Sequence, residues 1–379
     1  MLGGRVSRKL LLTNHRAEVN VPISAIDSIT PAFEHTKRQL FKPFRFGQWV
    51  RLALVGLLAG ELGSGGNLNL NANPAQQSHA QIPAIGDILH KIDPAILASV
   101  LTMIAITGLV LLIVMAFISS VMRFILFDSV LTRECRIRAG WSRRQDNGWK
   151  YFLWLLGLIL ATLAASAVLI GGPVAFASAM GWFHPWRAHL VELVVTGIVV
   201  VLLFAAFMLA LALVHVLTKD FVVPQMALEG IGALEGWRRL WPMIEGDIKG
   251  FAIYVGMKII LTIVAGIAIG IVGVILGLIL AVPVIAIVAT VVIASKNAGL
   301  TWDVFTITAA VLAGCVLLLI FFFLISLLSV PAIVFFPAYS IYFFAGRYRP
   351  LNLALYAPAQ APVVPQTSPP FTPPPLPAV

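Results

Sequence analysis

The stretch AILASVLTMIAITGLVLLIVMAFISS, residues 95–120, decides the fold class because it contains no charged side chain. About 20 apolar residues in an α-helix cross a bilayer core of about 30 Å, so this stretch is long enough to span a membrane. Five other apolar stretches lie along the chain, at residues 49–62, 151–170, 190–217, 251–295 and 304–346. The pattern predicts an all-α fold, a polytopic helical membrane bundle with six to eight crossings.

The overall composition also indicates a membrane protein. Of the 379 residues, 60% are hydrophobic and 11% are charged, and the mean hydropathy is +0.96. Soluble domains contain about 25% charged residues, so a water-soluble enzyme and a disordered chain are both excluded. The two cysteines, Cys135 and Cys315, are too few for a disulfide framework.

The number of crossings depends on the last two stretches, which are too long for one simple span each. Pro283 lies in the first of them, and Pro331 and Pro337 lie in the second. A kinked span plus an interfacial segment in each gives six crossings, a hairpin in each gives eight, and one of each kind gives seven. The stretch 49–62 is the weakest span, because it is short and contains Arg51 and Glu61. It crosses only if Arg51 reaches the near interface and Glu61 the far one, and we expect both residues at an interface.

The basic residues predict the orientation. Lys and Arg number 26 against 16 Asp and Glu, which gives a formal charge of +10. With six crossings, 22 of the 26 fall on one side of the membrane, and loops rich in Lys and Arg stay in the cytoplasm. We therefore expect a protein of the bacterial cytoplasmic (inner) membrane with both termini inside. The number of basic residues on the cytoplasmic side changes little with seven or eight crossings, so it does not decide the number of crossings.

The crossings divide the chain into three parts. They are a cytoplasmic N-terminal segment at 1–48, a transmembrane domain at 49–346 and a Pro-rich cytoplasmic tail at 347–379. Within the transmembrane domain, an external loop is expected at 63–94 and cytoplasmic loops at 121–150 and 218–250. In the first part, Thr30 is a candidate N-cap before Pro31, and an interfacial amphipathic helix is predicted up to Lys42, with Phe33 and Phe41 near one face.

Two of these segments have a clear composition of their own. The loop 218–250 has apolar residues at helical spacing from Leu234 to Ile248, and Pro242 is expected to divide it into two short helices on the inner membrane face. Residues 357–379 of the tail contain nine of the chain's 23 prolines and are expected to form an extended polyproline-type segment. Whether a ligand binds to the tail is left open.

Three ionisable residues are candidates for an intramembrane polar site: Lys258, Asp128 and Asp220. Lys258 lies deepest in an apolar stretch, and such a residue must face a partner, a cavity or the interface. The two carboxylates are the counter-ions expected from their depth, with Arg123 as another candidate partner for Asp128. Alternatively, the long stem of Lys258 extends to the inner headgroups. Structural pairing is favoured over a proton relay. A relay needs a chain of ionisable groups, and the sequence offers few of them.

Two further sets of residues are candidates for packing and for lipid contact. Gly266, Gly270, Gly273 and Gly277 form two small-xxx-small motifs, which let helix backbones approach closely. We expect them to pack helices within the bundle, with dimerisation or a flexible gating helix as the alternative. Basic residues on the inner surface would attract anionic headgroups at about 1 kcal/mol each. They are Lys37, Arg38, Lys42, Arg45, Arg136, Arg138, Arg143 and Arg144.

The motifs of common enzymes are absent from the sequence. It lacks HExxH, the GxxxxGK[ST] phosphate loop and the GxSxG turn. His184 and His189 share a short external segment, but no acidic residue or Cys lies beside them at ligand spacing. We therefore expect no metal and no cofactor, and we favour a non-enzymatic protein. Nucleic acid is not expected as a partner, because the positive-inside rule already accounts for the basic charge. A homo-oligomer or a membrane-protein partner is left open.

Three stretches together resemble a known family. They are FKPFRFGQW at residues 41–49, DFVVPQMALE at 220–229 continuing to GWRRLW at 236–241, and VPAIVFFPAY at 330–339. Over about residues 25–350 the chain resembles bacterial multi-pass proteins grouped around the membrane domain of glycerophosphoryl diester phosphodiesterase. In that family the membrane domain is sometimes joined to a soluble catalytic barrel. The 48 residues before Trp49 are too few for such a barrel, so the resemblance implies the membrane fold without the activity.

These observations lead to an expected function and two alternatives. We expect a non-enzymatic structural or accessory component of envelope or lipid homeostasis. The first alternative is a transporter or channel for a lipid-like or small amphipathic solute, with Lys258, Asp128 and the glycine-rich helix on its pathway. The second is a partner that docks a separate lipid phosphodiesterase chain.

Overall fold

Helices account for all the regular structure in the part of the chain that is described. The computed structural model describes residues 24–61, 94–297 and 304–356, and every regular element within these ranges is helical. A helix satisfies its backbone N–H and C=O groups internally, as apolar surroundings require. The predicted all-α class is therefore confirmed. The predicted external loop before Pro94 and the tail beyond Tyr356 lie outside the described residues.

Five segments are long and apolar enough to cross a membrane: Pro94–Thr132, Ile137–Ala179, Arg187–Glu229, Ile248–Val282 and Leu312–Ala345. The full order of elements is α2 (Ile29–Phe41), α3 (Phe46–Leu58), α6 (Pro94–Thr132), α7 (Ile137–Ala179), η3 (Trp186–His189), α8 (Leu190–Leu217), η4 (Thr218–Val222), α9 (Val223–Glu229), α10 (Ala233–Gly246), α11 (Ile248–Asn297), α12 (Val304–Leu328), α13 (Val330–Ala345) and α14 (Arg349–Tyr356). The described chain thus contains the helices of a polytopic membrane protein.

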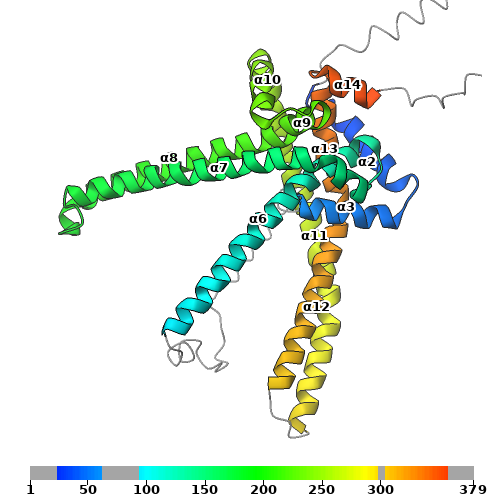
Figure 1. The fold of residues 1–379 in the computed structure, drawn as a ribbon. Coiled ribbons are helices and arrows are strands. Elements are labelled where there is room, and N and C mark those ends of the chain that lie inside the picture. Colours follow the sequence, from blue (N-terminus) through cyan, green and yellow to red (C-terminus); the bar gives the residue numbers. More distant parts are fainter. Residues whose placement is uncertain (1–23, 62–93, 298–303, 357–379) are drawn as a thin grey trace, which may run out of the picture.

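The helices converge in one part of the molecule (Figure 1). Most of the buried side chains belong to the segments that meet there. There α13 packs against α2, α3, α6 and α14, and α9 packs against α6, α7 and α14. The start of α11 joins them through Tyr254, whose ring stacks on Tyr339 of α13. We call this part the body; it comprises residues 24–61, 120–152, 217–258 and 326–356. Its fully buried side chains include the rings of Tyr151, Tyr254 and Tyr339. The core of the protein therefore lies in the body.

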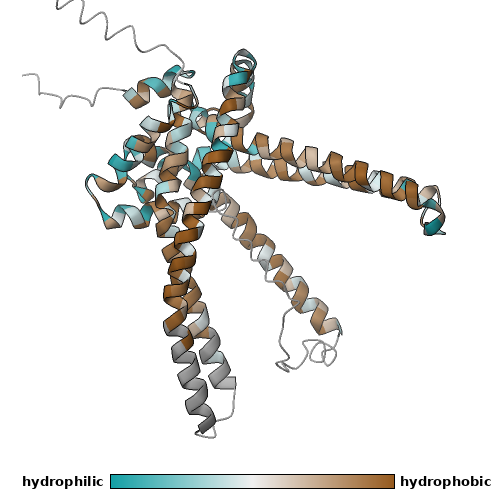
Figure 2. Ribbon diagram, turned by 180° about the vertical axis from the view of Figure 1, so that it is seen from behind, coloured by the Kyte–Doolittle hydropathy of each residue, from teal (hydrophilic) through white to brown (hydrophobic). Residues whose placement is uncertain are grey.

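Three apolar arms leave the body and diverge from one another (Figure 1). They are residues 94–119 of α6, the α7–α8 hairpin at 153–216, and the α11–α12 arm at 259–297 and 304–325. Most of the residues that are coloured along these arms are hydrophobic (Figure 2), and many of their large apolar side chains are exposed. Water would disfavour such surface by about 25 cal/mol per Å², whereas lipid chains accept it. The arms are therefore the membrane-embedded part of the molecule.

The long helices correct several predicted breaks. α11 is one helix of 50 residues that continues through Pro283, so the hairpin needed for eight crossings does not form there. α7 continues through Pro173 to Ala179, beyond the predicted end of that span at Ile170. α10 continues through Pro242, so its division into two helices was wrong. An internal proline removes one hydrogen bond and bends a helix more often than it ends one.

The segments predicted as cytoplasmic loops are largely helical. In residues 121–150 only 133–136 lie outside helices, and residues 218–229 continue the direction of the chain from α8 through η4 and α9. The short helix α3 has 13 residues and is not among the five candidate spans. Glu61, which would have to reach the far interface, lies buried in the body instead. The exact number of crossings stays a prediction.

The predicted amphipathic helix forms as α2, but its faces are arranged differently from the expectation. His35, Gln39 and Leu40 are buried against the body, whereas Phe33 and Phe41 point outward. The polar residues can be buried because they find partners there: the Gln39 amide nitrogen donates to the Ser129 carbonyl oxygen at 2.8 Å. Phe33 and Phe41 are therefore exposed and can contact another apolar surface.

Candidate functional site

Five charged side chains lie together inside the body and form the candidate site, which we call the charge cluster. Its members are Glu61, Arg123, Lys219, Asp220 and Lys258, and each is at most 10% exposed. They come from the end of α3, from α6, from η4 and from α11. Burial of an unpaired charge costs several kcal/mol, so the partners of each group decide what the cluster can do.

The first pair of the charge cluster joins α11 to η4. The Lys258 ammonium donates to the Asp220 carboxylate, which also accepts the Tyr254 hydroxyl at 3.0 Å. Tyr254 lies one helical turn before Lys258, so both side chains point to the same partner. The Tyr254 ring stacks on the Tyr339 ring of α13, with centroids 5.1 Å apart. Of the two counter-ions predicted for Lys258, the structure brings Asp220 to it.

The second pair joins α3 to η4. Glu61 follows the left-handed Gly60, at φ +77°, which turns the chain at the end of α3, and its carboxylate pairs with Lys219. Glycine adopts this conformation without a Cβ clash. The sequence interpretation placed Glu61 at a membrane interface, and the structure corrects this because Lys219 neutralises it inside the body.

The neighbouring residues Lys219 and Asp220 reach opposite partners because they lie in η4, a π-helical turn between α8 and α9. Lys219 points to Glu61 and Asp220 points to Lys258. The turn is held in place by Thr218, whose hydroxyl donates to the Val214 carbonyl at 2.6 Å. Single π-helical turns are rare and occur frequently at functional sites. η4 thus connects the two ion pairs.

Arg123 is the member of the charge cluster without a carboxylate of its own. Its guanidinium donates to the Ala59 carbonyl oxygen at 2.9 Å and to the Tyr151 hydroxyl at 3.1 Å. Its Nε has no partner among the described residues. It also interacts electrostatically with Glu61. With all groups ionised, three cations face two carboxylates, so the cluster has one excess positive charge.

Asp128 belongs to a different site. Its carboxylate binds Arg143 at 2.7 Å and Arg144 at 2.7 and 2.8 Å, at the junction of α6 and α7. The expected pairing with Arg123 or Lys258 is therefore wrong. Five residues along an α-helix correspond to a rotation of about 140°, so Asp128 faces away from Arg123.

The basic residues predicted to contact lipid differ in how freely they reach the surface. Lys37, Lys42 and Arg45 have exposed side chains. Arg136 and Arg138 are exposed as well, and Arg136 pairs with Glu134 at 2.8 Å. Arg38 and Arg143 are exposed but lie near Glu34 and Asp128, respectively. The Arg144 side chain is only 13% exposed and has its partners inside the body, which leaves little of it for a headgroup.

The predicted glycine motifs lie on α11, and two of their members face α12. A Cβ on Gly273 would lie 3.1 Å from Ile325 Cδ1, and one on Gly277 would lie 3.5 Å from Phe321 Cε2. At Gly270 nothing lies within 4 Å. The close approach of the two helices in this arm therefore involves the second motif.

Sequence reasoning found Lys258 and Asp220 but missed the rest of the charge cluster. The available signal was the occurrence of Arg123, Lys219 and Glu61 at the ends of apolar stretches, where a charge is also expected at an interface. Within the described ranges, no group of three or more His, Cys, Asp or Glu residues is placed to hold a metal ion.

Comparison with known proteins gives one match. The sequence profile of a family of unknown function (DUF7544) matches residues 23–354. No curated protein matches the chain, and no solved structure matches it. The match leaves the resemblance to the phosphodiesterase membrane domain untested, so that resemblance stays a prediction.

Proposed function

Because the chain belongs to DUF7544, a family of unknown function, we propose its role from the geometry of the body. The protein is a non-enzymatic integral membrane protein that serves as a structural or accessory component of envelope or lipid homeostasis. It lies in the bacterial inner membrane with both termini in the cytoplasm. Its exposed basic residues contact anionic headgroups of the inner leaflet.

The pairing of both buried carboxylates supports the structural role. Glu61 is neutralised by Lys219 and Asp220 by Lys258, and these pairs tie α3 and α11 to η4. Breaking a buried pair by removing one partner costs about 3–5 kcal/mol, because the other charge stays buried. A proton relay would instead require a chain of groups that can both take up and release a proton. The charge cluster is thus suited to hold the body in one arrangement.

The excess positive charge favours a second candidate, a transporter or channel for a lipid-like or small amphipathic solute. Arg123 has neutral partners and an Nε without a partner among the described residues, so it has capacity for an anionic group. The π-helical turn beside it is the kind of element that rearranges at functional sites. A third candidate, docking of a separate lipid phosphodiesterase, rests on the sequence resemblance alone.

A double-mutant cycle on the first ion pair distinguishes the structural role from transport. We would compare Lys258→Met, Asp220→Asn and the double variant in the full chain. Each single variant leaves one buried charge without its partner and is expected to lose about 3–5 kcal/mol of stability. The double variant removes both charges and is expected to recover most of this loss. Thermal unfolding in detergent measures the effect, and Glu192→Gln, at an exposed site on α8, is the control.

The same variants are tested for complementation of an envelope phenotype in a strain that lacks the protein. For a structural role, the phenotype follows the amount of folded protein, so the double variant restores both. A double variant that is as stable and abundant as the wild type but fails to complement contradicts the structural role. That result would favour the transporter, because it would require the charges themselves.

A further inference from the structure

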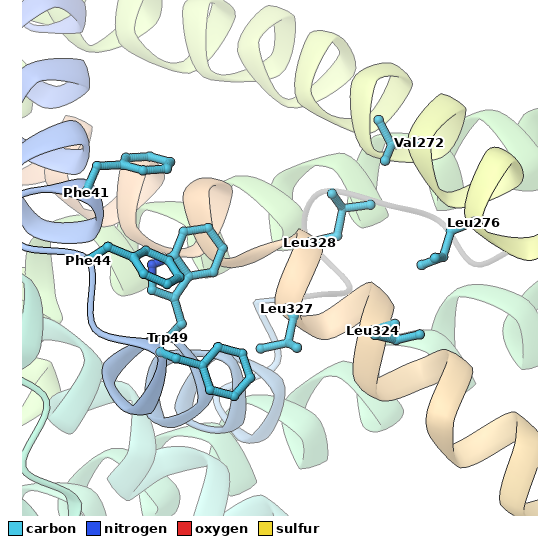
Figure 3. Close-up of a pocket in the computed structure, with 9 residues that line it drawn as sticks. Phe41, Phe44, Trp49, Val272, Leu276, Leu324, Leu327 and Leu328 are labelled. Atoms are coloured by element: carbon cyan, nitrogen blue, oxygen red, sulfur yellow. The ribbon is translucent and has the colours of Figure 1, made fainter.

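An apolar groove of about 430 Å³ lies between the body and the α11–α12 arm (Figure 3). One wall is the corner between α2 and α3, with four aromatic residues: Phe41, Phe44, Phe46 and Trp49. The other wall consists of aliphatic residues of α11 and α12, among them Val272 and Leu324. Ligand sites in proteins usually have volumes of about 300–1,000 Å³, so the groove is large enough for a small molecule.

The aromatic wall is preformed by contacts within the chain. The Trp49 indole donates to the Leu40 carbonyl oxygen at 3.2 Å, which fixes the ring. Phe41 and Phe44 pack on this ring, with centroids 5.8 and 5.7 Å away. The phenylalanines of the wall are nevertheless 54–60% exposed. Such a cluster of exposed rings indicates a surface that meets another apolar group.

The aliphatic wall determines which environment the groove faces. Val272 and Leu324 belong to an arm whose surface is apolar on nearly all sides. Because this arm is embedded in lipid, the groove opens toward the acyl chains of the bilayer. The occupant must therefore have a long apolar part.

The charges at the corner indicate which chemical group the other end of the occupant carries. Lys42 and Arg45 alternate with the aromatic residues of the wall in the sequence FKPFRF at residues 41–46. Both side chains are exposed, and neither has an ion pair among the described residues. Two cations beside an apolar groove complement a molecule that combines an acyl chain with an anionic headgroup. Phosphate is the anionic group common to membrane phospholipids.

We propose that the groove binds one anionic phospholipid of the inner leaflet. An acyl chain lies in the groove between the aromatic corner and the α11–α12 arm. The headgroup phosphate contacts Lys42 and Arg45, the exposed cations of the same corner. This inference rests on the lipid contact of the proposed function and adds a specific site to it. The site is distinct from the charge cluster, whose members do not line the groove.

Brominated lipids test the site directly, because bromine on an acyl chain quenches nearby tryptophan fluorescence. The purified full chain in detergent is titrated with brominated phosphatidylglycerol, which is anionic, or with brominated phosphatidylcholine, which is zwitterionic. The difference in quenching between the wild type and Trp49→Phe isolates the signal of the groove. Two cations at about fivefold each predict about 25-fold tighter binding of the anionic lipid.

Two pairs of variants assign the signal to the two parts of the site. Val272→Trp fills the groove and is expected to abolish lipid binding at Trp49. The signal of Trp49 is again taken as the difference with and without Trp49→Phe, so that the added tryptophan cancels. Val274→Trp is the matched control, since both valines are exposed on α11 (45% and 64%) but Val274 does not line the groove.

Lys42→Gln with Arg45→Gln is expected to remove the preference for the anionic lipid. Arg238→Gln with Lys249→Gln changes the net charge equally at other exposed positions and is expected to keep it.

The outcomes that overturn the proposal are defined for each part of the site. If Val272→Trp binds lipid like Val274→Trp, the acyl chain does not lie in the groove. If both lipids bind equally to the wild type, the cations do not recognise a headgroup. If Val272→Trp converts an oligomer to a monomer without changing lipid binding, the occupant is a second copy of the chain. Each result leaves the double-mutant cycle at Lys258 unaffected, so the two proposals fail separately.

Discussion

His35 is a buried polar residue whose two ring nitrogens both have partners in the body. Its Nε2 lies 2.9 Å from the Val130 carbonyl oxygen, which can only accept, so Nε2 is the protonated nitrogen of the neutral ring. Its Nδ1 lies 3.3 Å from the Tyr342 hydroxyl. Burial, together with the nearby positive charge of Arg133, lowers the pKa of His35 below its usual value. The folded body therefore favours the neutral imidazole.

This shift predicts that the protein loses stability in mild acid. The unfolded chain binds a proton at His35 near pH 6.5, whereas the folded chain binds it only at lower pH. The contribution is fully present above about pH 6.5 and is lost as the pH falls from there through the folded pKa. Thermal unfolding in detergent at pH 7.5 and pH 5 measures it, and His35→Gln is expected to reduce the difference. An unchanged pH dependence in His35→Gln would contradict the assignment.

The residue scale also shows the limit of reasoning from sequence about charges. A lysine as deep as Lys258 must face a partner, a cavity or the interface, and this requirement follows from the apolar sequence around it. The choice between Asp128 and Asp220 does not, because it depends on the direction in which each carboxylate points. The π-helical turn directs Asp220 to Lys258, and the rotation of α6 directs Asp128 to Arg144.

At the scale of elements, the crossing of α6 and α7 depends on a glycine. A Cβ on Gly148 would lie 2.4 Å from Val121 Cγ2 and 3.0 Å from Val121 Cα, which belongs to the backbone of α6. A side chain can rotate away from such a contact, but a helix backbone must move. The close approach of the two helices in the body therefore requires glycine at this position.

Gly148→Ala is accordingly expected to destabilise the body by about 1–3 kcal/mol, the usual range for overpacking. Gly157→Ala lies on the same helix with nothing within 4 Å of the added Cβ, so it serves as the control. It is expected to be neutral or slightly stabilising, because alanine favours helix by up to about 1 kcal/mol over glycine. Unfolding in detergent compares the two variants. Equal stabilities would show that α6 and α7 are not tightly packed at Val121.

At the scale of the whole molecule, the arrangement is a polar-cored body with three apolar arms (Figures 1 and 2). α6 alone has 39 residues, about 58 Å of helix, which exceeds the thickness of a bilayer including its headgroups. Part of each long helix can therefore belong to the body while the rest spans the membrane. For the stretch 304–346 this division explains the excess length, because residues 326–346 belong to the body.

Cysteine labelling tests which side the parts of the molecule face. In a background with Cys135 and Cys315 replaced, a cysteine at His184, at the tip of the α7–α8 arm, is expected to react with an external impermeant maleimide. A cysteine at Arg238 in α10 is expected to react only after the membrane is permeabilised, because the basic body faces the cytoplasm. External labelling at position 238 would contradict the orientation. Protection at position 184 would show that this arm does not cross.

The sequence by itself determined the class of the protein. Uncharged runs longer than a bilayer core require helices whose backbone groups bond internally, and this requirement is local, so it can be seen in residues 95–120 alone. The same local logic predicted α2 and identified Lys258 as a residue that must face a partner, a cavity or the interface. It failed at Pro173 and Pro242, because a proline also occurs inside a helix that its neighbours hold in place.

The tertiary structure alone decided which charges meet and where the lipid-facing groove forms. Glu61 and Lys219 are 158 positions apart in the chain, and no pattern along the sequence specifies that they pair. Likewise, the aromatic corner of α2 and α3 becomes a groove only because Val272 and Leu324 lie opposite it. Such contacts arise from how complete helices pack, and burial then selects the arrangement in which both carboxylates of the charge cluster have a cation beside them.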